Sequence, residues 1–173
     1  SFGNMRSEMA DLKSSVASFA ASCANKLRAQ SCVCKTITVF VSSNRFREDL
    51  QQYGNAATST LLTASSDTQT ITSAALRCLE QIYVPGIMYK KSGVVLSDIC
   101  QDSPLQLDLF LTSPKLKERN NLMHTLDNIN HRYGVKTLHL AVEGTECQAW
   151  KVKCEYRSRN YLTNINDILT IKI

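Results

Sequence analysis

The residue types most capable of metal or nucleophilic chemistry in this chain are seven cysteines and three histidines. Cys32 and Cys34 are separated by a single residue, which is closer than the usual spacing of a zinc-binding pair, and no matching pair follows. His124 and His131 lie two helical turns apart without an evident carboxylate or cysteine partner, so we interpret them as exposed helix residues. The sequence contains no nucleophile motif, phosphate-binding glycine loop or paired metal carboxylates. We therefore predict no catalytic residue, no metal site and no cofactor within this chain.

A different chemistry, peptide recognition, is indicated by the stretch Gln106-Leu107-Asp108-Leu109-Phe110. Pro104 precedes it and Ser113-Pro114 follows it, so a neighbouring helix or strand cannot easily continue through it. Two leucines and a phenylalanine in a short linker are expected to be buried against the protein itself or against a partner, because exposed apolar clusters favour association. Two interpretations remain open. The stretch is an anchor whose apolar side chains enter a partner's pocket, or it is an edge strand with Leu107 and Leu109 turned inward.

The elements before this stretch are predicted from the periodicity of apolar residues. Spacings of three and four predict an amphipathic helix from Leu12 to about Gln30. Strict alternation then predicts a half-buried strand over 36–43, with its apolar side chains on one face and hydroxyl groups on the other. A polar loop separates it from a second strand over 57–63, which is rich in threonine and serine.

A second helix and a long strand complete this first module. The helix is predicted to begin at a cap residue, Asp67 or Thr68, and to end before Pro85-Gly86. The strand follows over 87–99, with a bulge predicted at Gly93. Together with a short strand at the amino terminus, this order predicts an α+β fold with the split βαβ pattern of the ferredoxin-like class. Both helices then cover one face of a four-stranded sheet and leave the other face open.

The open face is expected to carry hydroxyl groups and a few cations, which suit the phosphate oxygens of a duplex. Such contacts position DNA without reading its sequence. A face that is simply solvated is an equal alternative on composition alone. The aromatic pattern of an RNA-recognition strand is absent. The side chains assigned to this face are Arg6, Thr36, Thr38, Ser42, Lys90 and Lys91.

The chain after the linker predicts a second, smaller module. Ser113-Pro114 begins a helix that Gly134 ends. Alternation predicts a strand over 137–142 and, after a turn, a returning strand over 148–154 with Trp150 facing inward. These elements make a small αββ unit. We therefore divide the chain into a first domain over 1–100, a linker over 101–112 and a C-terminal domain over 113–173.

Charge and cysteine usage restrict the class of protein. The net charge of +5 is spread evenly, which permits nucleic-acid contact without demanding it. No apolar run approaches the length of a membrane span, and the amino terminus has no apolar signal segment. The cysteine count is odd, and Cys23, Cys78 and Cys100 are predicted to lie on apolar faces, so we expect a reduced, cytoplasmic protein. Because the chain begins at Ser1 rather than methionine, we expect it to be part of a longer protein.

A family resemblance adds what spacing cannot. The relevant segments are Ser1-Phe2-Gly3, Ala24-Asn25-Lys26-Leu27-Arg28, Val39-Phe40-Val41-Ser42-Ser43-Asn44-Arg45 and Tyr89-Lys90-Lys91-Ser92-Gly93-Val94. These segments resemble the little-finger domain of Y-family translesion DNA polymerases, most closely the UmuC or DNA polymerase V type. In that family the little finger lays its sheet along the duplex backbone. The resemblance therefore implies that the side chains of the open face contact DNA.

The pentapeptide at 106–110 resembles the motif by which bacterial DNA polymerases and repair factors bind the sliding clamp. The resemblance implies that Gln106 docks against the pocket rim and that Asp108 faces solvent. Leu109 and Phe110 would fill the pocket. Leu107 completes the motif.

The tail Ser158-Arg159-Asn160-Tyr161-Leu162-Thr163 resembles the C-terminal extension of UmuC-type polymerases, which usually reads Ser-Pro-x-Tyr-Thr-Thr. Ser158, Tyr161 and Thr163 match this pattern, whereas Arg159 and Leu162 depart from it. The resemblance implies contacts with UmuD-like accessory subunits and a recombinase filament. A segment that only completes the small domain is an equal alternative.

These features together indicate the DNA-binding and clamp-tethering C-terminal portion of an error-prone polymerase in DNA repair and the SOS response. The parent family polymerises DNA with Mg²⁺ bound in a palm domain, to which nothing in this chain corresponds. A DinB-like enzyme is an alternative, although such enzymes commonly end at the clamp peptide. A non-enzymatic adaptor that binds only proteins is another, and DNA binding by the first module distinguishes it.

Overall fold

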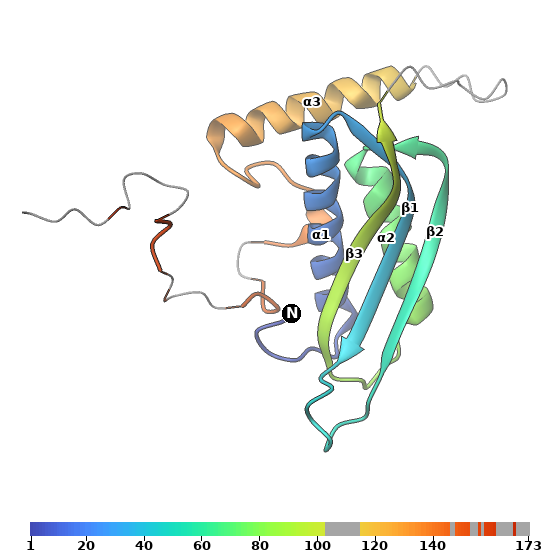
Figure 1. Ribbon diagram of the computed structural model, residues 1–173, viewed down its shortest axis with the longest axis vertical. Helices are drawn as coiled ribbons and strands as arrows, with labels where there is room; N and C mark the ends of the chain where they lie inside the picture. The colour runs from blue at the N-terminus through green and yellow to red at the C-terminus, as the bar shows by residue number, and fades with distance from the viewer. Residues whose placement is uncertain (103–114, 146–147, 153–155, 157, 162–167, 169–173) are drawn as a thin grey trace, which may run out of the picture.

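The computed structural model describes residues 1–102, 115–145, 148–152, 156, 158–161 and 168. The elements within these residues are α1 (Met9–Ala29), β1 (Cys32–Ser43), β2 (Gly54–Ser65), α2 (Thr68–Ile82), β3 (Tyr89–Gln101), α3 (Lys115–Tyr133) and the 3-10 helix η1 (Ala141–Glu143) (Figure 1). Each of the predicted helices is present, and so are the three strands predicted over 36–43, 57–63 and 87–99. No described helix has both the length and the apolarity needed to cross a membrane.

The three strands form one antiparallel sheet in the order β2-β1-β3. An isolated antiparallel bridge between Arg6 and Tyr89 places the amino-terminal segment at the outer edge of β3. The chain therefore passes from this segment through α1 to β1, and β3 lies between the segment and β1 in the sheet. In the same way the chain passes from β2 through α2 to β3, and β1 lies between these two strands. This split βαβ pattern confirms the predicted α+β fold class. Among the described residues, this bridge is all that represents the predicted amino-terminal strand.

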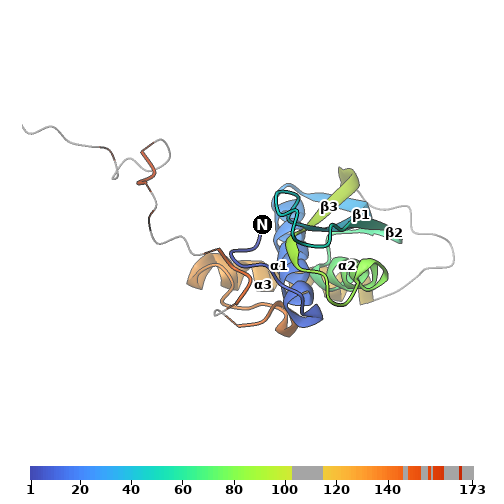
Figure 2. The ribbon, with the colours of Figure 1, turned by 90° about the horizontal axis from the view of Figure 1, so that it is seen from below.

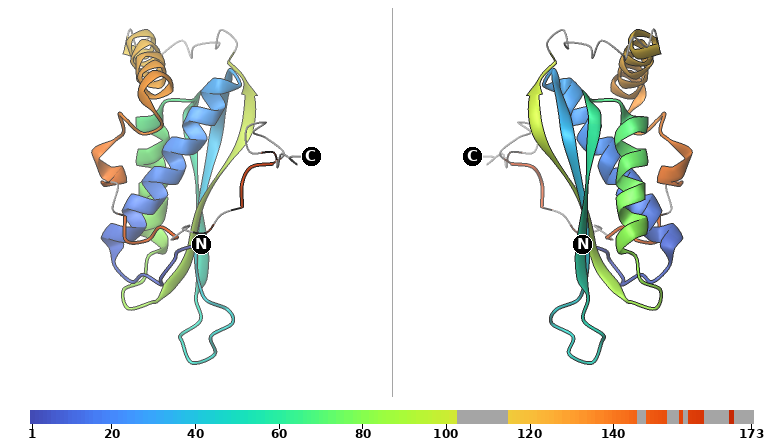
Figure 3. Two further views of the ribbon diagram at one scale, coloured as in Figure 1. Left: turned by 90° about the vertical axis from the view of Figure 1, so that its left-hand side faces the viewer. Right: turned by 90° about the vertical axis from the view of Figure 1, so that its right-hand side faces the viewer.

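Helices α1 and α2 pack side by side on one face of the sheet (Figures 2 and 3). Small residues on α1, such as Ala20 and Ala24, let the helix approach its neighbours closely, and both are fully buried. Each large apolar side chain buried in this layer contributes about 2 kcal/mol by its removal from water. The core between the helices and the sheet includes Leu12, Val16, Leu27, Ile37, Val39, Val41, Ile71, Leu79 and Ile82.

The predicted cap of α2 is confirmed at Asp67. Its carboxylate Oδ2 accepts a hydrogen bond from the backbone amide of Thr70 at 2.8 Å. The same oxygen accepts from the Thr70 hydroxyl at 2.6 Å. A cap of this kind stabilises a helix by about 1 kcal/mol, because it satisfies an amide that has no partner within the helix.

The predicted bulge at Gly93 is wrong. Strands β1 and β3 stay in register through the pair Phe40–Gly93, and the register shifts between Ser42 and Ser43 instead. The glycine serves side-chain packing, because a Cβ atom at Gly93 would lie within 3.0 Å of the Phe40 ring. A glycine inside a strand pattern marks either a bulge or a close approach, and here it marks a close approach.

The two strands predicted in the C-terminal unit are not found among its described residues. After α3, residues 134–140 form turns and irregular backbone, and η1 follows. The side-chain amide of Asn130 replaces a strand partner, because it donates to Leu138 O at 2.9 Å and accepts from Leu138 N at 2.8 Å. Leu138 and Val142 remain 45% and 38% exposed. The alternation that suggested a strand therefore does not mark a buried face here.

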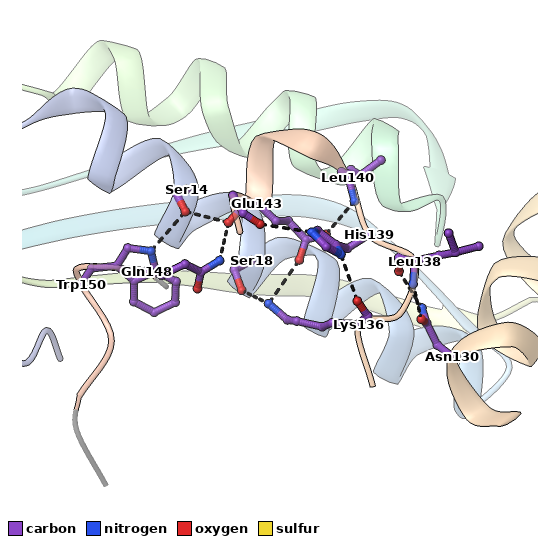
Figure 4. A network of polar contacts seen from close by, with 11 residues as sticks. Ser14, Ser18, Asn130, Lys136, Leu138, His139, Leu140, Glu143, Gln148 and Trp150 are labelled. Atoms are coloured by element: carbon purple, nitrogen blue, oxygen red, sulfur yellow. Dashed lines mark hydrogen bonds and ion pairs between the residues drawn. The ribbon is translucent and has the colours of Figure 1, made fainter. Parts of the chain in front are cut away.

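The C-terminal unit packs against α1 through Trp150, whose inward orientation is confirmed. The indole is 6% exposed and meets the rings of Phe2 and Phe19 edge-on, at centroid distances of 6.4 and 5.4 Å. Its Nε1 donates to Ser14 Oγ at 3.1 Å, and that hydroxyl donates to the Glu143 carbonyl at 2.7 Å (Figure 4). One aromatic side chain thus joins α1, the amino-terminal segment and the C-terminal unit.

Candidate nucleic-acid interface

The face of the sheet opposite α1 and α2 is covered by no helix of the described chain (Figure 3). Side chains of β1 at 36, 38, 40 and 42 point to this face, because the residues between them are buried against the helices. The register of the ladders places Thr36 between Thr60 and Ser97, Thr38 between Thr58 and Val95, Phe40 between Ala56 and Gly93, and Ser42 between Gly54 and Lys91. Four of the predicted contacts, Thr36, Thr38, Ser42 and Lys91, therefore share one face.

A groove of about 850 Å³ lies at one end of this face, beside the β1–β2 hairpin. Its lining contains three cationic side chains, from Arg45, Lys90 and Lys91, and no carboxylate. Two aromatic rings, Phe40 and Phe46, line the same groove. Cations with hydroxyl and amide groups around them form a surface suited to phosphate.

The other end of the face carries a carboxylate. The hydroxyl of Thr36 donates to the carboxylate of Asp98, which is exposed on β3. In the middle, the hydroxyls of Thr38 and Thr58 are hydrogen-bonded to each other at 2.9 Å. Because a carboxylate repels phosphate, an anionic ligand is favoured at the hairpin end rather than beside Asp98.

Two predicted contacts, Lys90 and Arg6, are directed away from the open face. The Lys90 ammonium donates to the carbonyls of Phe2 and Gly3 at 2.8 and 3.2 Å, so it holds the amino-terminal segment although its stem lines the groove. The Arg6 guanidinium donates to the Ala149 carbonyl and lies 3.8 Å from Asp11 of α1. The structure therefore brings Arg6 together with α1 and the C-terminal unit rather than with the other predicted contacts.

The hairpin residues Arg45 and Phe46 are not among the predicted contacts, because the segment between the first two strands is interpreted from its sequence as a polar loop. The backbone amide of Phe46 donates to Asn44 Oδ1 at 3.1 Å, in a local turn that leaves the residue 94% exposed. Arg47 is not available to an external anion in the same way, because it pairs with Asp49 at 2.7 Å and its hydrogen bond lowers the pKa of that carboxyl. A phenylalanine inside an otherwise polar loop was the available signal.

The clamp-binding prediction falls on 106–110, which lies outside the described residues. Ser158 and Tyr161 of the tail are described and exposed, and the Tyr161 amide donates to the Arg159 carbonyl at 3.0 Å. Thr163 lies outside the described residues. The assigned roles of these side chains stay predictions.

The three histidines line a second cavity, of about 510 Å³, between α1, α3 and residues 135–143. His124 and His131 are exposed, as predicted. His139 lies between the carbonyl oxygens of Lys136 and Gly144, at 3.0 and 3.1 Å. Within the described part of the chain, no three His, Cys, Asp or Glu side chains are placed to share a metal ion.

The cysteines differ in burial. Cys34 is fully buried, and burial raises the pKa of its thiol to about 11, so it stays protonated at neutral pH. Cys78 is buried and Cys23 is half-buried, and burial raises the pKa of both thiols. Cys100 is exposed near the end of β3, so its predicted place on an apolar face is wrong. Residues 98–101 at the end of β3 are all exposed, and alternation alone does not show where a strand ceases to be covered.

Two family models match this chain. The impB/mucB/samB family C-terminal domain matches residues 1–109, which include α1, α2 and the whole sheet. The chain belongs to this family. A second match, to a Domain of unknown function (DUF4113), covers residues 120–171, which include most of α3, η1 and Trp150.

Individual relatives agree with this membership. Protein UmuC of Salmonella typhimurium is 36% identical over 172 residues, which are 99% of this chain and 40% of that protein. Protein SamB of Salmonella typhimurium is 34% identical, over 100% of this chain and 40% of its own length. Protein MucB of Escherichia coli is 34% identical, over 97% and 39%. The chain thus spans about two fifths of the length of these relatives, and its resemblance to the C-terminal region of UmuC-like Y-family polymerases is confirmed.

Proposed function

We propose that this chain is the DNA-binding and clamp-tethering C-terminal portion of an error-prone translesion DNA polymerase in DNA repair and the SOS response. The observation that supports DNA binding is the helix-free sheet face that ends in a groove lined by the cations of Arg45 and Lys91 and by no carboxylate. Hydroxyls along β1 and the cations at the hairpin would hold successive phosphates of a duplex. Polymerisation itself would need acidic residues and Mg²⁺ in another part of the polymerase.

Binding of duplex DNA should be weak, independent of sequence and strongly reduced by salt. Replacing Arg45 and Lys91 together with alanine removes two phosphate contacts. The plot of log affinity against log salt concentration should therefore become less steep by about two units, since each contact contributes about 0.9 to the magnitude of its slope. Lys90→Ala should have a smaller effect, because its ammonium already bonds two backbone carbonyls. Fluorescence anisotropy of a labelled duplex at several salt concentrations measures these slopes.

A matched control removes the same charge from the helix layer. Lys26→Ala with Arg77→Ala takes two exposed cations from α1 and α2 and leaves the sheet face intact. This variant should keep the wild-type slope. If it loses as much slope as the groove variant, the binding reflects net charge and the assigned face is wrong. If the wild-type chain binds no duplex at all, the protein-binding adaptor becomes the better proposal.

Clamp tethering is proposed for 106–110 because this sequence resembles the clamp-binding motif. DNA binding and clamp binding would then lie on adjacent parts of one chain. Ser158, Tyr161 and Thr163 are proposed to contact accessory partners of the UmuD and recombinase-filament kind. The exposure of Ser158 and Tyr161 is compatible with such contacts. Pull-down of the two candidate partners with a Tyr161→Ala chain tests this assignment, and undiminished capture of both would contradict it.

A further inference from the structure

Phe40 lies on β1, the central strand of the sheet, and points to the open face. Its ring packs across the strands onto Gly93, its partner in the β1–β3 ladder, since a Cβ at Gly93 would lie within 3.0 Å of Cζ and Cε1. The ring therefore rests on bare backbone on one side, and Phe40 as a whole is 38% exposed. An aromatic ring supported on one side presents its other side as a rigid surface for a planar group.

The surroundings of this ring favour an anion. Lys91 lies across the ladder from Ser42, one step along the same face, and Arg45 lines the groove from the hairpin. The groove has no carboxylate in its lining, and the fully exposed ring of Phe46 stands at its hairpin side. Its volume of about 850 Å³ lies within the usual range of ligand sites. A flat aromatic surface beside cations is the combination by which proteins bind unpaired nucleotides.

We propose that this groove binds single-stranded DNA, with an unpaired base stacked on Phe40 and the neighbouring phosphates held by Lys91 and Arg45. Bases inside a duplex are stacked on one another and cannot offer a face to a ring on a flat sheet, so the ring selects an unpaired base. The inference rests on the proposed DNA binding for the nature of the ligand. It adds a second mode of DNA binding, because contacts with the DNA phosphates alone need no aromatic surface on the protein.

The test compares two single strands that differ only in their bases. One is a fluorescent oligothymidylate about ten nucleotides long, and the other is an abasic strand of equal length and charge. The wild-type chain should bind the thymidylate more tightly. Phe40→Leu keeps apolar volume but removes the ring, and it should lower thymidylate affinity by about 5- to 150-fold while leaving abasic affinity unchanged.

Gly93→Ala provides an independent variant that keeps every side chain of the groove. The added Cβ must displace the Phe40 ring, so it should also lower thymidylate affinity selectively. Leu62→Ala is the control, because Leu62 is a 91% exposed apolar residue of β2 outside the groove. It should bind both strands as the wild type does. Far-UV circular dichroism and thermal unfolding identify any variant that fails to fold, and the remaining variant then decides.

The proposal is overturned if the folded Phe40→Leu or Gly93→Ala chain binds thymidylate as tightly as wild type. It is also overturned if the wild type shows no preference for thymidylate over the abasic strand, or if both affinities fall equally. Its failure is distinguishable from failure of the proposed function, which concerns salt-dependent binding of duplex. Duplex binding that is unaffected by Phe40→Leu, together with equal binding of the two single strands, rejects only the stacking site.

Discussion

The Arg28 guanidinium of α1 binds groups from α3 and from the start of α2. Its Nε and Nη2 donate to the two carboxylate oxygens of Asp127 at 2.6 and 2.8 Å. Its Nη1 donates to the Ser66 carbonyl at 2.6 Å and to the Thr68 hydroxyl at 2.9 Å. The Arg28 side chain is only 7% exposed, so a missing partner would leave a buried charge unsatisfied. This residue therefore joins α1, the start of α2 and α3.

The pH dependence of stability should report on Asp127. Burial alone would raise the pKa of its carboxyl, but hydrogen bonds and charge from Arg28, with the amide of Asn25, hold that pKa below its ordinary value. A lowered folded-state pKa stabilises the fold above the unfolded value of about 4, and this contribution is lost as pH falls through the folded value. Asp127→Asn should cost about 2 kcal/mol at pH 7 and flatten the decline in unfolding free energy below pH 5.

Urea unfolding from pH 7 down to pH 3 measures both effects. Glu80→Gln is the control, because the Lys13–Glu80 ion pair at 2.7 Å is exposed and such pairs contribute about 0–1 kcal/mol. The control should follow the wild-type curve closely. Identical pH profiles for wild type and Asp127→Asn would show that the carboxylate does not stabilise the docking of α3.

At the scale of elements, the amino-terminal segment and the segment around Trp150 meet backbone to backbone. The Gly3 amide donates to the Trp150 carbonyl at 3.1 Å, and a Cβ at Gly3 would lie 2.7 Å from the Lys151 carbonyl oxygen. That oxygen belongs to the backbone, so it cannot move aside as the tip of a flexible side chain would. The close approach requires a residue without a Cβ.

Gly3→Ala should therefore loosen the docked segment, at a cost of about 1–3 kcal/mol. Trp150 is the single tryptophan of the chain, so its fluorescence reports on this contact directly. The variant should show red-shifted emission and stronger quenching by acrylamide. Gly54→Ala is the matched control, because its Cβ would meet only Ser42 Cβ, at 3.9 Å. Unchanged emission in Gly3→Ala would mean that the segments stay docked and that the close approach tolerates a Cβ at residue 3.

Elements whose signals are local could be predicted from the sequence. Periodicity and the Asp67 cap placed α1, α2 and the strands to within a few residues, because a single buried face dictates each pattern. The hairpin predicted after α3 failed because Leu138 finds its backbone partner in the Asn130 side chain, a contact that alternation cannot reveal. The bulge predicted at Gly93 is wrong because a glycine is needed there for another purpose, which is to make room for the ring of Phe40 on the neighbouring strand.

The candidate site was predictable to the same extent. Alternation along β1 placed Thr36, Thr38 and Ser42 on one face, because strand side chains follow a strict period of two. The direction of a long cationic side chain follows no such period. Lys90 and Arg6 turn toward backbone carbonyls of distant segments, which only the assembled fold brings near. Only the three-dimensional arrangement shows that Phe40 and Phe46 line one groove.

At the scale of the whole molecule, the described C-terminal unit and the open face use different sides of the first module. Residues 115–145 lie along the helix layer, where Asp127 and Glu143 contact Arg28 and Ser14 of α1 (Figures 1 and 3). No helix among the described residues covers the opposite face of the sheet. DNA bound on that face, as we propose, need not displace residues 115–145, and the sequence at 106–110 joins the two parts of the chain.

Clamp binding should depend on the apolar end of that sequence. Replacing both Leu109 and Phe110 with alanine should cost about 2–4 kcal/mol of binding free energy, because buried anchors carry most of the affinity of a short peptide. A loss of this size removes a micromolar interaction from ordinary detection. Asp108→Ser should change the affinity little, since residue 108 is proposed to face solvent. Titration of the cognate sliding clamp against each variant by calorimetry measures these differences.

Thermal unfolding of the same variants separates the clamp anchor from the edge-strand alternative. An anchor peptide adds no side chains to the hydrophobic core. The Leu109→Ala, Phe110→Ala chain should therefore keep the wild-type melting temperature and lose its affinity for the clamp. A buried edge strand predicts the reverse, because truncating two core side chains costs several kcal/mol of stability. Early unfolding of the double variant would therefore favour the strand. Normal clamp binding by a stably folded double variant would refute the anchor at 106–110 outright.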